Sequence, residues 1–286
     1  MHMQWQVGDV SITLVRQHMA SVDAAGMFPG SNAEEIIAAN GDWLKPHFID
    51  DNGMMPLSIH ALVVKSMGKT IVVDTCLGNR PVAGFDAMSH LGDQFLHDFA
   101  AAGFGIDTVD FVACTHLHFD HVGFNTVLVD GQWVATFPNA RYLFGRIEYE
   151  HWDAGNLGAA VTFGDAVKPV FVAGLADLVD TDHKITDEVR FAPTPGHTPG
   201  HVSVHIESKG QRAVITGDMM HHPIQIANGA IDWVMSADVD SPRAALTRHA
   251  FRNEFADQPV LVIGTHFGPP TAGHIKQVDG NYRLVV

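Results

Sequence analysis

Three histidines and an aspartate fall within six residues of one another in the segment 114–125, CTHLHFDHVGFN. Burying so many lone-pair donors is unfavourable unless something binds them, and histidine is the commonest metal ligand in proteins. If the chain stays extended beyond an expected strand at 111–113, His116, His118 and Asp120 point roughly the same way, whereas His121 points elsewhere. This arrangement favours two adjacent ions, the first served by His116 and His118 and the second by Asp120 and His121.

Four ligands are too few for two ions, so further ligands must come from distant parts of the sequence. Three candidates stand beside glycines at the ends of expected strands: His197 in PTPGHTPGH, Asp218 in VITGDMMHH and His266 in VLVIGTHFGPP. The form strand, small residue, ligand places these side chains at one rim of a sheet. Asp218 can bridge both ions because a carboxylate has two oxygens.

Short runs rich in valine and isoleucine alternate with stretches of helical periodicity along the chain, which predicts an α/β architecture. Strands are expected at 10–15, 59–64, 70–73, 111–113, 133–136, 140–144, 202–206, 213–216 and 260–263, and helices at 32–40, 93–102, 146–152 and 241–255. Each half of the chain contains strands followed by helical sequence, so two similar sheets packed face to face, with helices outside, would fit. Residues 19–56 lack clear periodicity and are interpreted as a long loop with a short helix.

Composition narrows the range of functions. The chain has 286 residues, 46% of them hydrophobic, and a formal net charge of −15 without any run of lysine and arginine. Nucleic acid and anionic membrane surfaces are therefore poor partners. Two cysteines exclude a disulfide framework. The first ten residues, MHMQWQVGDV, lack a signal-peptide pattern, and no apolar run approaches the roughly 20 residues of a membrane span. We therefore expect a soluble cytoplasmic protein.

The order HxHxDH, distant His, Asp, His resembles the metallo-β-lactamase superfamily of binuclear metallohydrolases, as do VVDTC at 72–76 and TPGHTPGH. The resemblance implies a single domain over residues 1–286 with a four-layer αββα sandwich, whose two halves meet near residue 175. It implies one metal on His116, His118 and His197, another on Asp120, His121 and His266, and a bridging Asp218. Asp74 is either an ordinary turn aspartate after a strand or, as we favour, a buried carboxylate that orients a ligand histidine. Zinc suits this all-nitrogen and oxygen ligand set best, although manganese, iron and cobalt also suit it.

The sequence departs from two family patterns. The best-known true β-lactamases have a cysteine where this chain has Asp218, and lactonases of the superfamily often have a tyrosine at the position of His221. His221 either donates a hydrogen bond to the substrate in place of that tyrosine or simply packs. Four apolar side chains in or near the motif segments are predicted to wall a substrate pocket: Phe119, Phe267, Met27 and Phe28.

MFPG at 27–30 and the segment GTHFGPPTAGHI resemble the branch that contains N-acyl-homoserine lactonases and methyl-parathion-type hydrolases. We therefore predict a hydrolase of lactones or other apolar esters, with promiscuous phosphotriesterase or arylesterase activity. A hydroxide between the two ions would attack, and Asp120 would receive and pass on a proton. The resemblance also implies a lid and homodimer contact at residues 19–56. The alternatives are a β-lactam hydrolase and a metal-containing sensor or effector with little turnover.

Overall fold

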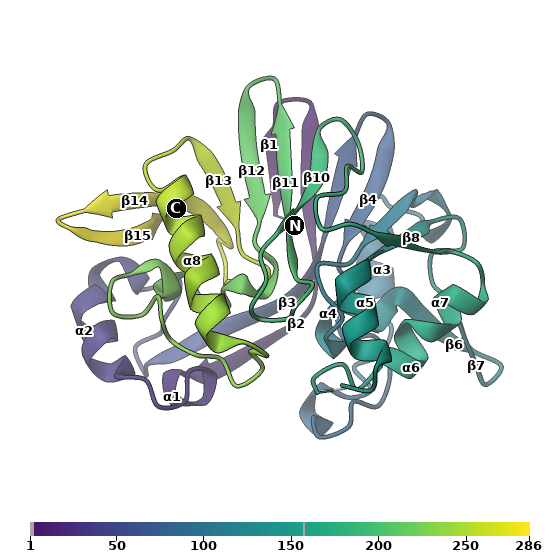
Figure 1. Cartoon of the computed structure of the whole chain (residues 1–286), viewed down its shortest axis with the longest axis horizontal. Coiled ribbons are helices and arrows are strands. Elements are labelled where there is room, and N and C mark those ends of the chain that lie inside the picture. The colour runs from purple at the N-terminus through teal and green to yellow at the C-terminus, as the bar shows by residue number, and fades with distance from the viewer. Residues whose placement is uncertain (1–2, 157) are drawn as a thin grey trace.

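Two β-sheets face each other at the centre of the fold, and helices cover their outer sides (Figure 1). The computed structural model describes residues 3–156 and 158–286. The first sheet has the order β1-β2-β3-β4-β5-β8-β9, made of β1 (Gln4–Val7), β2 (Val10–Asp23), β3 (Met54–Ser66), β4 (Lys69–Val73), β5 (Phe111–Ala113), β8 (Arg141–Gly145) and β9 (Ala176–Val179). The second has β10 (Val189–Pro193), β11 (Val202–Ser208), β12 (Gln211–Ile215), β13 (Val260–Ile263), β14 (Ala272–Val278) and β15 (Asn281–Val285) in sequential order.

Three apolar layers hold the four structural layers together. Between the sheets, Ile12 and Val64 of the first sheet pack in one cluster with Val204 and Ile215 of the second. A second cluster lies between the first sheet and its helices, and a third lies between the second sheet and its helices. The predicted αββα sandwich is therefore confirmed. The chain passes from the first sheet to the second between β9 and β10.

The helices on each side bury apolar residues at helical spacing. On the first sheet, Phe95 and Phe99 of α3 (Gln94–Ala101) and Trp152 of α5 (Arg146–Asp153) enter the core. On the second, Phe251 and Phe255 of α8 (Ser241–Phe255) do the same. These three helices lie where the sequence predicts them. Shorter elements complete the fold: α1 (Ala24–Met27), α4 (Phe119–Val122), α6 (Phe163–Ala166), α7 (Lys168–Val172), and the hairpin β6 (Thr126–Val129) and β7 (Gln132–Ala135).

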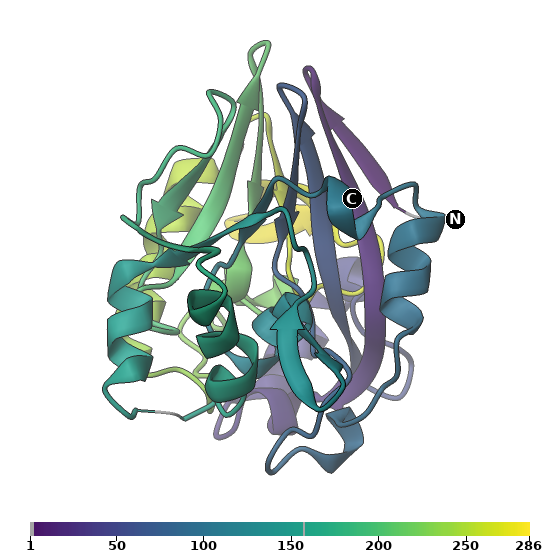
Figure 2. The ribbon, with the colours of Figure 1, turned by 90° about the vertical axis from the view of Figure 1, so that its right-hand side faces the viewer.

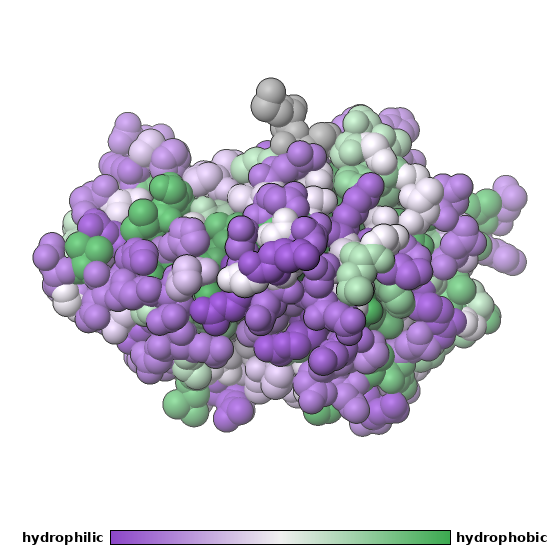
Figure 3. All heavy atoms as spheres, turned by 90° about the horizontal axis from the view of Figure 1, so that it is seen from above, coloured by the Kyte–Doolittle hydropathy of each residue, from purple (hydrophilic) through white to green (hydrophobic). Residues whose placement is uncertain are grey.

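The two ends of the sandwich differ. The turns of three hairpins meet at one end, where Asp9 N donates to Ser208 Oγ and Ser66 Oγ donates to Glu188. Figure 2 shows these turns on one side and most helices toward the other, and Figure 3 shows the turn end covered mainly by hydrophilic side chains. Because β4, β5, β12 and β13 all run away from this end, the loops after them emerge together at the opposite rim.

The segment 19–56 differs from its prediction as a long loop. Strands β2 and β3 pair as far as Asp23 and Met54, so both ends of the segment belong to the first sheet. The intervening residues form α1 and the longer helix α2 (Ala33–Leu44). Through Leu44, α2 packs in the apolar cluster between the second sheet and its helices. The extra strand length was missed because this end of the hairpin alternates only between half-buried and exposed residues.

No helix in the described part of the chain combines the length and the apolar character that crossing a membrane requires.

Candidate metal centre

Four loops at one rim of the sandwich deliver the seven predicted ligands. His116 and His118 follow β5, and Asp120 and His121 lie in the short helix α4 that comes next. The other three come from the second sheet: His197 from the β10–β11 loop, Asp218 from the 3-10 turn after β12, and His266 from the loop after β13. The structure therefore brings together all seven side chains that sequence spacing singled out.

Four of the seven side chains surround one carboxylate oxygen of Asp218. Asp218 Oδ2 lies 3.1 Å from Nε2 of both His121 and His266, 3.6 Å from His197 Nε2 and 3.7 Å from His116 Nε2. Metal–ligand bonds of about 2.0–2.2 Å in a tetrahedral site place neighbouring ligand atoms roughly 3.3–3.6 Å apart. The observed spacings of 3.1–3.7 Å lie close to that range, as expected for atoms that could share a cation.

The predicted ligands form two subgroups that could each hold an ion. His116, His118 and His197 form one, and Asp120, His121, Asp218 and His266 form the other; a third, overlapping group joins His221 to His197 and Asp218. Six of these side chains are buried, whereas the Asp120 side chain keeps 17% of its surface exposed. The first subgroup is all imidazole and the second contains both carboxylates, so the centre is chemically asymmetric.

The hydrogen bonds on the far side of the rings determine what the centre can bind. The Nδ1–H groups of His121, His197 and His266 donate to the carboxylates of Asp74 and Asp238 and to the carbonyl of Ser58, at 2.9–3.0 Å. These acceptors carry no proton, so in each neutral ring Nε2 presents a lone pair. Four ring nitrogens then converge, with His121 Nε2 lying 3.3 Å from His266 Nε2 and His197 Nε2 lying 2.9 Å from His118 Nδ1. In their deprotonated form these nitrogens would all direct lone pairs at a bound cation, so the residues fit a metal centre.

The pKa shifts show the same asymmetry. Burial keeps the pKa of His116, His118 and His197 well below the usual value, so these rings stay neutral. Burial also opposes charge on His121, but the nearby carboxylates of Asp218, Asp120 and Asp74 raise its pKa well above the usual value. Burial favours the protonated form of Asp218, but the surrounding imidazoles outweigh this effect and hold the pKa of its carboxyl well below the usual value. The negative potential that attracts protons to the second subgroup would equally attract a divalent cation.

Comparison with known families identifies the fold. The family model described as the metallo-beta-lactamase superfamily matches residues 54–281. The chain belongs to the metallo-beta-lactamase superfamily. That match includes all seven residues of the centre.

Individual relatives are more distant. The N-acyl homoserine lactonase AiiA of Bacillus thuringiensis subsp. kurstaki is 27% identical over 124 residues, which is 43% of this chain and 43% of the lactonase. The chain thus aligns with less than half the length of the curated relatives that it matches. The crystal structure of the hydrolase AbOPH in the beta lactamase superfamily superposes with a TM-score of 0.80 at 27% identity, covering 99% of this chain and 96% of the other. AidC, a dizinc quorum-quenching lactonase, has a TM-score of 0.77 at 20% identity, with coverages of 99% and 96%, which supports the fold alone.

In this superfamily member, Asp74 lies behind His121, as its predicted orienting role requires. Its Oδ2 is 2.9 Å from His121 Nδ1, and it also accepts hydrogen bonds from the backbone N–H and the hydroxyl of Thr115, each at 2.8 Å. The carboxylate therefore sets the orientation of His121 and ties β4 to the loop after β5.

Replacing Asp74 by Asn is expected to weaken metal binding about 10–100-fold, the range typical of residues that orient a metal ligand. The amide cannot accept on both sides, so His121 loses its fixed orientation. Titration of the metal-free variant with zinc against a chromophoric chelator measures the change. The exposed Asp182→Asn should bind like the unaltered protein, and unaltered affinity in Asp74→Asn would contradict the orienting role.

His221 lies inside the cluster. Its side chain is buried, Nε2 is 3.1 Å from Asp218 Oδ2, and the ring stacks on His266 with a centroid distance of 5.4 Å and an interplanar angle of 8°. His221 therefore lies beside the predicted ions. It does not line the cleft that opens beside His118, so a contact between His221 and substrate stays a prediction.

A cleft of about 630 Å³ opens beside His118. Its described lining is mainly small or aromatic and contains neither lysine nor arginine: Phe85, His118, His151, Trp152, Asn156, Gly158, Ala159, Ser236, Ala237, Asp238 and Val239. Phe119 packs against the cleft residue Phe85 with ring centroids 4.6 Å apart. The predicted pocket wall needs correction for Met27, Phe28 and Phe267, which are packed in the apolar core on the second sheet. No described residue of 19–56 lines this cleft.

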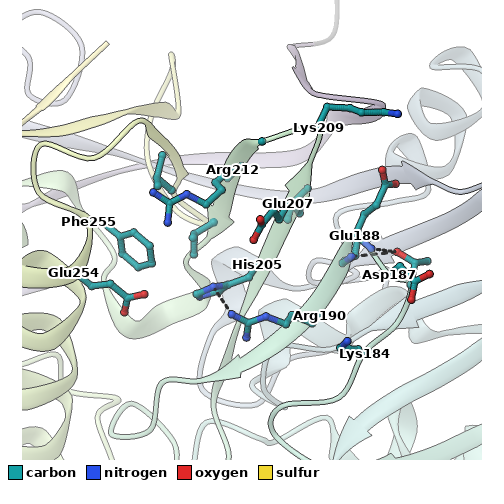
Figure 4. A pocket seen from close by; sticks show the side chains of 17 residues that line it. Lys184, Asp187, Glu188, Arg190, His205, Glu207, Lys209, Arg212, Glu254 and Phe255 are labelled. Atoms are coloured by element: carbon teal, nitrogen blue, oxygen red, sulfur yellow. Dashed lines mark hydrogen bonds between the residues drawn. The ribbon is translucent and has the colours of Figure 1, made fainter.

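A second hollow, of about 430 Å³, lies on the outer face of the second sheet beside α8 (Figure 4). Side chains of both charges line it, including Arg190, Arg212, Glu207 and Glu254. It shares no residue with the His/Asp centre, so of these two hollows only the cleft beside His118 borders the predicted chemistry.

Sequence reasoning missed two carboxylates that support the ligands. Asp238 accepts from His197 Nδ1 at 2.9 Å, and burial raises its pKa. Glu148 of α5 is buried beneath the loops that carry the metal ligands. Neither stands at a fixed spacing from a ligand, so their roles become visible only through contacts across the fold.

Proposed function

We propose that this protein is a metal-dependent hydrolase that opens lactones or cleaves other ester bonds of small, uncharged, largely apolar molecules. The observation that carries the proposal is the double position of His118. It belongs to a cluster of side chains that could hold a metal ion and also to the wall of the apolar cleft. A carbonyl group at the inner end of the cleft would therefore lie beside the metal centre.

The residues divide the work of holding two ions as the sequence predicts. His116, His118 and His197 would hold one ion, Asp120, His121 and His266 would hold the other, and Asp218 lies between the two groups. When bound, the ions would lower the pKa of a shared water to about 7, supply hydroxide and polarise the substrate carbonyl. Zinc is the ion we propose, since the donors are imidazole and carboxylate.

The side chains around the centre have separate tasks. Asp120 is the only one of the seven with a partly exposed side chain, so it can take a proton from the reacting water and release it toward solvent. Phe85, Trp152 and Val239 hold the apolar part of the substrate and exclude water from the reacting bond. Asp238 keeps His197 fixed while charge changes at the centre.

The cleft supports an uncharged substrate. Its described lining has no cationic side chain to pair with a substrate carboxylate or phosphate, and it includes the carboxylate of Asp238. A β-lactam with an ionised carboxyl group would find no partner for that charge there. The relative AiiA is a lactonase by name, which favours the lactone over other esters.

Purified protein with zinc or manganese restored is expected to hydrolyse an N-acyl homoserine lactone faster than a p-nitrophenyl ester, paraoxon or a cephalosporin. The His118→Ala variant should lose about 10³-fold or more in kcat/KM, because it loses both a ligand and a cleft contact. Initial rates for the four compounds, measured with the same enzyme preparation, test this order.

Each alternative predicts a different result. Preferred turnover of the cephalosporin would make β-lactam hydrolysis the function. Tight lactone binding without turnover, in protein that carries two ions, would indicate a sensor. Lactone hydrolysis that survives both chelation and His118→Ala would contradict the metal-dependent mechanism.

A further inference from the structure

The buried carboxylate of Glu148 joins the two loops that carry the first group of ligands. Glu148 lies on α5 and is only 1% exposed. Its Oε1 accepts from the backbone N–H of Leu117 at 3.1 Å and from Trp152 Nε1 at 2.6 Å. Its Oε2 accepts from the hydroxyl of Thr198 at 2.7 Å and from the backbone N–H of Gly200 at 3.0 Å. Four donors and two oxygens thus match the ionised form.

Two of these donors belong to residues next to predicted metal ligands. Leu117 separates His116 from His118, and Thr198 directly follows His197. One carboxylate therefore connects the loop after β5 with the loop between β10 and β11, two segments that come from different sheets. All three ligands of the first group lie on these two loops, whereas Asp120, His121 and His266 make no contact with Glu148 among its hydrogen bonds.

The packing around Glu148 leaves little freedom. A Cβ at Gly200 would overlap the backbone N and Cα of Glu148, so the β10–β11 loop lies directly on the start of α5. Trp152, one turn later on the same helix, packs its ring 5.4 Å from that of His118. The helix therefore contacts the metal-bearing loops both through the carboxylate and through an aromatic side chain.

We propose that Glu148 is a positioning residue that sets the spacing of His118 and His197 and thereby the affinity of the ion held with His116. The inference rests on the proposed function, because it requires that ions bind. The side chain does not touch substrate or the reacting atoms. Its effect should be greatest on that ion, because Leu117 and Thr198 directly adjoin its three ligands, whereas Asp120 and His121 lie further along the loop after β5 and His266 lies on another loop.

The test is a zinc titration of metal-free protein for Glu148→Gln, with a chromophoric chelator as competitor. The amide keeps the shape of Glu148 but replaces one acceptor oxygen by a donor, so two neighbouring donors lose their acceptor. One of the two zinc affinities is expected to fall about 10–100-fold, as for other residues that position a metal ligand, while the other stays within about twofold. With cobalt in place of zinc, the visible spectrum should change in the bands of one ion only.

Two further variants keep the result decisive. Glu150→Gln makes the same chemical change at an exposed position of the same helix and should leave both affinities unaltered. Thr198→Val removes only one of the four donors and should weaken the same ion by about fivefold, as expected for one hydrogen bond. It decides the matter if Glu148→Gln does not fold.

The outcomes separate this inference from the proposed function. If the unaltered protein binds no ions, the proposed function fails. If it binds two, and Glu148→Gln or Thr198→Val lowers the melting temperature but leaves both affinities unaltered, or weakens both ions equally, Glu148 is only a structural residue and the inference is overturned.

Discussion

Replacing Asp218 by Ala is expected to remove at least one of the two ions and to lower lactone turnover by about 10³-fold or more. Oδ2 of this residue lies within 3.7 Å of four imidazole nitrogens predicted to bind metal. Among the described residues, no other carboxylate has ion-pair contacts within 4 Å to both groups of ligands. Losing it removes several kcal/mol of charge stabilisation, and each 1.4 kcal/mol or so corresponds to a tenfold change in rate. Metal content by elemental analysis and steady-state kinetics measure the two effects.

The matched control is Asp187→Ala, which removes an exposed aspartate from the hollow on the second sheet. It should retain two ions and full activity. Asp218→Asn should lie between the two, since it keeps one neutral oxygen but loses the negative charge that holds the pKa of His121 well above its usual value. If Asp218→Ala retained both ions at full occupancy, Asp218 would not be the residue that joins the two halves of the centre.

The candidate site was predictable from sequence because its ligands follow strand ends. Strands that run in one direction end at the same rim of the sandwich. Ligands that closely follow β5, β12 and β13 therefore lie at that rim, and this placement does not depend on the other elements. The motif HxHxDH after β5 supplies four of the seven ligands at local spacing. These constraints act along the chain, and a single sequence is enough to read them.

The supporting carboxylates obey no such local rule. Asp238 reaches His197 across 41 residues, and Glu148 reaches Gly200 across 52. Their sequence surroundings resemble an ordinary loop and an ordinary amphipathic helix. Asp238 and Glu148 form hydrogen bonds with the metal-bearing loops only because distant segments pack close together. A single sequence does not reveal that packing.

Apolar residues were the least predictable part of the site. Met27, Phe28 and Phe267 pack with Trp233 and Phe48 in the core, although the segment around them was expected to face the centre. Hydrophobicity alone predicts burial but not which apolar layer receives the side chain. Phe85, which lines the cleft, stands in a segment without any motif.

Replacing Gly123 by Ala is expected to lower the free energy of unfolding by about 3 kcal/mol, in the upper range for a side chain forced into a packed interior. An added Cβ would fall on the carbonyl carbon and oxygen of Leu77, and neither of these backbone atoms can move aside as a side chain could. The segments that meet here are linked by hydrogen bonds from Gly123 N to the carbonyl of Cys76 and from Thr75 N to that of His121, both 2.7 Å long. Chemical denaturation of the metal-free protein measures the loss.

The same change should also weaken the second ion, because the two segments carry His121 on one side and Asp74 on the other. Pushing them apart lengthens the hydrogen bond that orients the His121 ring, so affinity falls together with stability. Gly41→Ala is the matched control: its Cβ meets nothing within 4 Å in helix α2, and the change should stabilise the protein by about 0.5–1 kcal/mol. A Gly123→Ala variant that matched the unaltered protein in both stability and zinc affinity would show that this backbone contact does not hold the metal loop in place.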